Sequence, residues 1–133
     1  MQEKAIAKPL DSRLYHRGRE VLVRLAKRYG LPLRQSYERL GKRALRLVHR
    51  YGQARQNRRM QREIGRLKRF LGRVYRDVRR KLVSRPDLAD RFAEPLALIA
   101  RLLAQQRTDK GKLYALHAPE VEMSVQGQDR QGL

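Results

Sequence analysis

Apolar residues recur every three or four positions along most of the chain, which is the spacing of amphipathic α-helices. One such stretch covers residues 14–29, follows the capping residues Asp11 or Ser12, and stops at Gly30. A second stretch of the same kind covers residues 36–51. The pattern therefore predicts two helices joined by a short turn.

The third stretch has apolar positions that alternate in steps of four and three, the repeat of a coiled coil. These positions are Met60, Ile64, Leu67, Leu71, Val74 and Val78. So narrow a seam is typical of a helix that packs against one partner helix. A fourth helix is expected from Pro86 to about Leu103, with Pro95 kinking it or restarting it.

These elements predict a mainly α fold, either an antiparallel helical bundle or a long helical hairpin. Residues 1–10 show no period and are interpreted as a leader, and residues 11–108 as one basic helical domain. The segment LYALHAPEVE, residues 113–122, contains a proline and favours a strand. We therefore expect a loop and a short C-terminal β-strand remnant within residues 109–123, followed by a disordered tail at 124–133.

Charge sets the class of partner. The 133 residues include 33 Lys and Arg against 13 Asp and Glu, a formal net charge of +20. Self-repulsion at this charge opposes compaction, so a polyanionic partner is expected. No cysteine is present, which excludes disulfides, thiolate zinc sites and cysteine nucleophiles and fits a cytoplasmic location. No membrane partner is expected: no apolar run reaches about 18 residues, and a membrane-surface helix is disfavoured by the narrow seam and the absence of Trp.

The positive charge is concentrated between residues 42 and 85, where 17 Lys or Arg stand against two acids. Arginines one helical turn apart cost an isolated helix about 0.2–0.5 kcal/mol per pair, which an adjacent phosphate backbone would remove. Arginine also suits bidentate phosphate contact. A solvated bundle face whose acids come from a partner is the alternative interpretation. The candidate DNA-binding residues are Arg43, Arg46, Arg50, Arg55, Arg58, Arg59, Arg62, Arg66, Arg69, Arg73 and Arg76.

No spacing that indicates catalysis or metal binding is visible. His16, His49 and His117 lie far apart and have no cysteine nearby, so we expect no metal site from them. Glu120 and Glu122 would share one face of a strand, where a solvated edge is the simpler interpretation. Phosphate loops, nucleophile elbows and dinucleotide fingerprints are all missing. We predict no catalytic residue, no metal ligand and no cofactor.

Five segments in this order resemble the central part of DDE transposases of the insertion-sequence-five family. They are QEKAIAKPLDSRLY, LPLRQSYERLGKRAL, RYGQARQNRRM, LGRVYRDVRRKL and DKGKLYALHAPEVE, which together extend over residues 2–122. The resemblance implies DNA binding and DNA transposition, a form of DNA recombination carried out by a mobile element. It also implies that residues 11–108 are a helical insertion in an RNase-H-like core, and that residues 113–122 are the strand that returns to its sheet.

The chain departs from the family at both ends. The family core holds three acidic residues that bind two divalent ions, usually Mg²⁺, and none of the acids here matches that triad. By this resemblance the chain alone is expected to be a truncated, catalytically inactive fragment. The ending MSVQGQDRQGL is interpreted as a frameshift product, because the next reading frame permits a Lys/Gly-rich loop of the kind the family pattern has.

Two classes of function stay open. One is the truncated transposase fragment, with non-specific DNA as its partner and with self-association or association with an intact transposase as further interactions. The other is a free-standing basic helical protein that binds RNA or the ribosome. The second explains the charge equally well and leaves the LYALHAPEVE segment unexplained.

Overall fold

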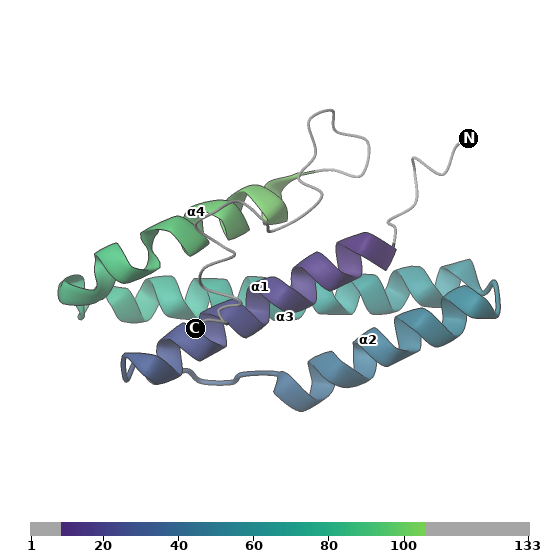
Figure 1. The fold of residues 1–133 in the computed structure, drawn as a ribbon, viewed down its shortest axis with the longest axis horizontal. Coiled ribbons are helices and arrows are strands. Elements are labelled where there is room, and N and C mark those ends of the chain that lie inside the picture. The colour runs from purple at the N-terminus through teal and green to yellow at the C-terminus, as the bar shows by residue number, and fades with distance from the viewer. Residues whose placement is uncertain (1–8, 106–133) are drawn as a thin grey trace, which may run out of the picture.

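The computed structural model describes residues 9–105, and all regular structure in this part is helical. The elements are α1 (Pro9–Arg28), α2 (Glu38–Gln53), α3 (Asn57–Leu82), the short 3₁₀ turn η2 (Pro86–Leu88) and α4 (Ala89–Ala104). Successive α-helices run in opposite directions (Figure 1). The prediction of a mainly α, antiparallel bundle is confirmed. The leader residues 1–8, the strand remnant within 109–123 and the tail at 124–133 lie outside the described residues.

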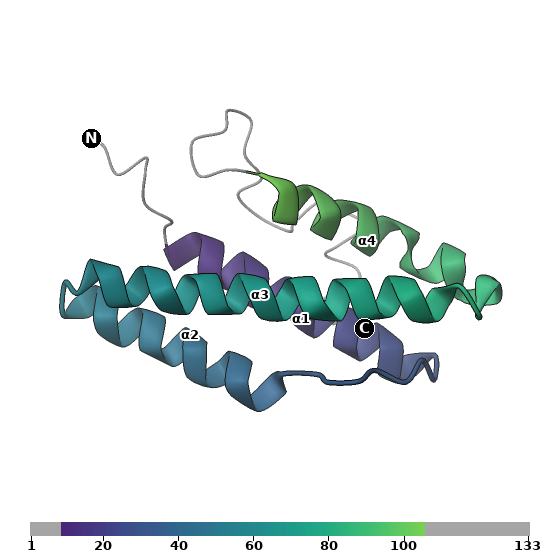
Figure 2. The ribbon, with the colours of Figure 1, turned by 180° about the vertical axis from the view of Figure 1, so that it is seen from behind.

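Helix α3 is the element on which the other helices pack. Its 26 residues correspond to about 39 Å at 1.5 Å per residue. Helix α1 lies across one side of it, with α2 and α4 on the two flanks, and the view from behind presents α3 in front of α1 (Figure 2). All six heptad positions of α3 are buried.

The expectation of a single partner helix for α3 is wrong. Phe70 and Gly72 are buried as well as the heptad seam, so the apolar face of α3 is wider than two positions in seven. At one point Leu71 of α3 and Ile99 of α4 both approach the backbone of Gly18 in α1: a Cβ on Gly18 would lie 3.3 Å from Leu71 Cδ1 and 3.4 Å from Ile99 Cγ1. Three helices therefore meet where Gly18 leaves room.

Helix α1 begins earlier and ends where the sequence indicates. It starts at Pro9 rather than at a cap on Asp11 or Ser12, because proline at the first helical position lacks only an N–H that would be unpaired there. At the other end, Gly30 has φ 69°. The Leu31 N–H donates to Ala26 O at 2.8 Å, which closes the helix with a Schellman motif.

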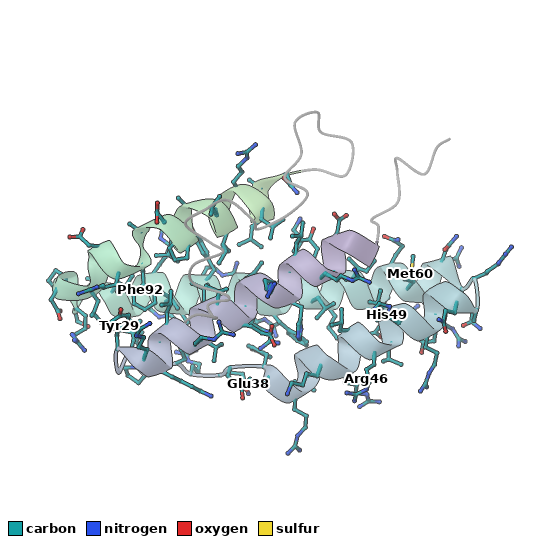
Figure 3. All side chains as sticks on the ribbon, in the orientation of Figure 1. Tyr29, Glu38, Arg46, His49, Met60 and Phe92 are labelled. Atoms are coloured by element: carbon teal, nitrogen blue, oxygen red, sulfur yellow. The ribbon has the colours of Figure 1, made fainter. Side chains whose placement is uncertain are left out.

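Helix α4 excludes one of the two outcomes predicted at Pro95, a restart of the helix. Pro86 opens the η2 turn, as expected, but the helix then continues without a restart through Pro95, which is buried. Pro95 has no N–H to donate to the carbonyl four residues before it, that of Arg91 in the first turn of the helix. Near the start of the helix, Phe92 packs edge-on against Tyr29, the residue that follows α1, with ring centroids 6.3 Å apart (Figure 3). None of the helices in residues 9–105 combines the length and apolar character needed to cross a membrane.

A buried arginine joins α1 to the start of α2. Arg19 is 1% exposed, and its Nη1 donates to Ser36 O at 3.0 Å while Nη2 lies 3.2 Å from His16 Nδ1. Its Nε is buried and has no hydrogen-bond partner. Burial lowers the pKa of this guanidinium, against the attraction of Glu20 and Glu38. The guanidinium occupies the space that a Cβ on Gly41 would need.

This packing predicts opposite effects for two Gly→Ala substitutions. At Gly41 a Cβ would lie 2.6 Å from Arg19 Nη2, and the overpacking should lower the free energy of unfolding by about 1–3 kcal/mol. At Gly65 a Cβ would meet only Arg69 Nη1, at 3.7 Å, so alanine should raise stability by about 0.5–1 kcal/mol. Urea denaturation of G41A and G65A measures both. Equal stabilisation of the two variants would show that Arg19 does not occupy this position.

Candidate nucleic-acid interface

The eleven arginines expected to contact DNA are all exposed, and they lie on α2, on the α2–α3 turn and on α3. On α2, Arg43, Arg46 and Arg50 lie on the side of the helix opposite the buried Ala44 and Val48. Figure 3 labels Arg46 on the outer side of α2. The structure therefore directs these α2 side chains away from the core.

On α3, six of the predicted arginines and Arg80 form one continuous row, here called the arginine ridge. At 100° per residue, the row occupies the side of α3 opposite the buried heptad seam. The distance along the helix from Arg58 to Arg80 is about 33 Å at 1.5 Å per residue, which is close to one helical turn of duplex DNA. The members of the ridge are Arg58, Arg62, Arg66, Arg69, Arg73, Arg76 and Arg80.

A shallow groove between α2 and α3 connects the ridge to the arginines of α2. Arg43 from α2 and Arg66 from α3 line this groove of about 140 Å³, together with the apolar side chains of Leu40 and Leu47. The ridge and the three α2 arginines, Arg43, Arg46 and Arg50, therefore belong to one surface, here called the basic face.

Most of the predicted arginines have no partner within residues 9–105. Arg66 is one exception, with its Nε 3.3 Å from Glu63 Oε1, and Arg59 is the other, with its Cζ 6.0 Å from the centroid of the Tyr51 ring. The two acids on α3, Glu63 and Asp77, are both buried. The described part of the chain therefore leaves most of the positive charge of the basic face without a paired carboxylate.

The turn between α2 and α3 places Arg55 in a backbone conformation that favours glycine. Its φ is 58°, and the N–H of Gln56 donates to Tyr51 O at 2.8 Å in a Schellman motif. A residue with a side chain is disfavoured there by about 1–2 kcal/mol relative to the right-handed conformation. The strained turn exposes an arginine at the end of the bundle, next to the start of the ridge at Arg58.

Of the two glycines within α3, Gly72 makes room for an arginine side chain and Gly65 does not need to. Gly65 and Gly72 are spaced one heptad apart, which would fit either close helix–helix approach or simple tolerance. A Cβ at Gly72 would lie 3.1 Å from Arg76 Nη1, and at Gly65 the nearest atom is Arg69 Nη1. The neighbours at both positions belong to α3 itself, so close approach of another helix does not explain them.

The aromatic residues of this region pack with the core. Phe70 is buried, and Tyr51 and Tyr75 are half-buried against the core cluster. Tyr37 stacks on Phe70, with centroids 4.7 Å apart and planes 13° apart. These rings therefore do not form an exposed row on which bases could stack.

Asp77 ties the connector after α1 to the C-terminal half of the ridge. Its Oδ2 accepts a hydrogen bond from the backbone N–H of Arg34 at 2.7 Å, and its Oδ1 accepts one from Arg80 Nη2 at 2.9 Å. Lys81 Nζ lies 3.3 Å from Oδ1 and donates to Pro32 O at 2.6 Å. Burial acts to raise the pKa of the Asp77 carboxyl, but the hydrogen bonds from Arg34, Lys81 and Arg80 outweigh it and hold that pKa below its usual value.

The lowered pKa of Asp77 predicts how stability depends on pH. A carboxyl whose pKa is lower in the folded state contributes stability above its unfolded pKa, near 3.8, and loses that contribution as pH falls through the folded pKa. D77N should be less stable than the parent chain by about 1–3 kcal/mol at pH 7. Urea denaturation between pH 7 and pH 2 should show this difference shrink below about pH 4. A difference that stays constant with pH would contradict the account.

Sequence reasoning missed Arg34, Arg80, Asp77 and Arg19. The first three are brought together although Arg34 and Asp77 are 43 positions apart, and no local spacing indicates such a contact. Arg19 resembles any exposed helix arginine in the sequence. Within residues 9–105, no three His, Cys, Asp or Glu side chains gather as metal ligands.

The chain is similar in part to a known protein. The chain is 57% identical over 56 residues to the uncharacterized protein ORF8 in the nfe locus of Rhizobium meliloti. The match covers 42% of this chain and 27% of the relative, so the chain spans about a quarter of the length of that relative. No protein-family model matches the chain, and no solved structure matches it significantly.

Proposed function

We propose that the bundle binds duplex DNA through the basic face, without sequence specificity. The observation that carries this proposal is the arginine ridge, whose seven side chains share one side of α3. Within residues 9–105, only Arg66 and Arg80 of the seven pair with a carboxylate. Guanidinium groups stay protonated at any physiological pH. The ridge is therefore a permanently charged row of groups that can each donate two hydrogen bonds to a phosphate.

Duplex DNA suits the shape of this surface. The ridge is rigid because the opposite side of α3 is buried in the bundle, and its length of about 33 Å is that of a helical turn of DNA. Binding would also relieve the repulsion between arginines one turn apart, about 0.2–0.5 kcal/mol per pair. No base-reading arrangement is proposed, because contacts to phosphate carry no sequence information.

We also propose the biological setting that the resemblance implies. In it, residues 11–108 are the helical insertion of an insertion-sequence-five transposase, residues 113–122 form the returning strand, and the chain acts in the cytoplasm. Binding and not catalysis is proposed for this chain, because none of its acids matches the acidic triad of that family. Translation of the flanking DNA in all frames tests this setting. Unrelated sequence on both sides would contradict it without affecting the DNA-binding proposal.

The binding itself is tested by fluorescence anisotropy with the full chain and a labelled duplex of 20 base pairs. We expect saturable binding at 50 mM salt, with affinities for unrelated duplex sequences that agree within about threefold. Competition by unlabelled single-stranded and structured RNA supplies the control. Tight binding to one RNA with only weak binding to every duplex would replace the proposal by the RNA-binding alternative.

A further inference from the structure

A separate cavity lies where the connector after α1 passes the C-terminal half of α3. Its volume is about 340 Å³, within the range of about 300–1,000 Å³ that is usual for ligand pockets. We call it the Arg34 pocket. Its lining includes Arg34, Tyr37, Arg73, Arg76, Asp77 and Arg80.

The charges around this pocket do not balance. Four arginines line it together with one carboxylate, Asp77, which already accepts hydrogen bonds from the Arg34 backbone and the Arg80 side chain. Within the described part of the chain, no carboxylate pairs with the guanidinium groups of Arg34, Arg73 or Arg76. The guanidinium groups of these three arginines therefore remain available to an anion in the pocket.

The pocket is held in place before any ligand binds. Asp77 fixes the backbone of Arg34 on one wall and the side chain of Arg80 on another. Tyr37 is stacked on Phe70 and held at φ 60°, a left-handed conformation that a tyrosine rarely adopts. Such strained residues concentrate at binding sites, where the surrounding structure maintains them.

We propose that the Arg34 pocket is a binding site for a phosphate group with more than one negative charge. An internal phosphodiester carries a single charge, whereas a phosphate monoester carries about −1.5 to −2 at pH 7. Three unpaired guanidinium groups favour the more highly charged group. Two sources supply it: the terminal phosphate of a DNA strand, and a free compound such as pyrophosphate. The inference rests on the proposed function, because both require that this side of the bundle binds phosphate.

Isothermal titration calorimetry tests the pocket directly. The full chain is titrated with inorganic pyrophosphate at an ionic strength held constant with KCl. We expect one saturable site per chain. The double variant R34Q/R73Q should weaken it at least tenfold. The control R58Q/R62Q loses the same charge at the other end of the ridge and should stay within twofold of the parent chain. All four arginines are exposed, and thermal denaturation verifies that both variants fold.

A second titration separates the two sources, using duplexes of one length with 5′-phosphate or 5′-hydroxyl ends. Tighter binding of the phosphorylated duplex that disappears in R34Q/R73Q identifies the strand end, and pyrophosphate binding with no difference between duplexes identifies a free compound. The proposed phosphate site is refuted if the parent chain shows no saturable pyrophosphate binding. It is also refuted if R58Q/R62Q weakens pyrophosphate binding as much as R34Q/R73Q does. Failure of the parent chain to bind any duplex would refute the proposed function instead.

Discussion

Neutralising three ridge arginines should weaken DNA binding by at least tenfold at 100 mM salt while leaving the bundle folded. The variant is R58Q/R62Q/R69Q, whose side chains are exposed and lie outside the Arg34 pocket. Each lost phosphate contact should reduce the salt dependence, the slope of log K against log salt concentration, by about 0.9. The three together should therefore reduce it by about 2.7. Fluorescence anisotropy over a series of salt concentrations measures both quantities.

The control for this variant removes the same charge elsewhere. R13Q/R17Q/R91Q changes three exposed arginines of α1 and α4 and should change affinity by no more than about twofold at 100 mM salt, where charges beyond about 10 Å are largely screened. Thermal stability should be unchanged or slightly higher in the ridge variant, because like-charge pairs one turn apart are removed. Equal loss of affinity in both variants would mean that net charge, rather than the ridge, determines binding.

Truncating Leu71 should destabilise the bundle by about 2–5 kcal/mol, the usual cost of a leucine-to-alanine change in a packed core. Leu71 is fully buried, and its Cδ1 would lie 3.3 Å from a Cβ added to Gly18 of α1. Ile99 of α4 approaches the same glycine. The cavity left by L71A therefore opens where three helices meet, and no single helix can shift to fill it.

The matched control is Leu40 on α2, which is 45% exposed. L40A removes the same atoms from a position that is partly in water already, so it should cost less than about 1 kcal/mol. Guanidinium denaturation of L71A and L40A gives the two free energies. A similar, small effect for both variants would show that α1, α3 and α4 do not share a core at Leu71.

The helical period predicted which residues of α3 are buried but not how many helices pack on it. Met60, Leu67 and Val78 follow from the period alone, because residues three and four apart share one side of a helix. The number of partners depends on residues beside the seam, such as Phe70, whose burial is decided by Tyr37 on a different segment. Tertiary contact of this kind leaves no trace in the local pattern.

In the candidate site, too, some residues could be predicted from the sequence and others could not. The exposed arginines could be predicted because charged side chains without partners stay in water, and the period places them opposite the core. The Arg34 pocket could not, since it depends on a contact between the Arg34 backbone and Asp77. Arg19 is the opposite case, a charged residue that the sequence would place on the surface and that is buried. Gly41 has no side chain, and this leaves space for the guanidinium inside the bundle.

The salt dependence of duplex DNA binding tests the central claim most directly. If all seven arginines of the ridge contact phosphates, the slope of log K against log salt concentration should be about −6. A slope between about −4 and −7, with similar values for unrelated sequences, would agree with the basic face as the binding surface. No binding at 50 mM salt, or an affinity that does not change with salt, would contradict it.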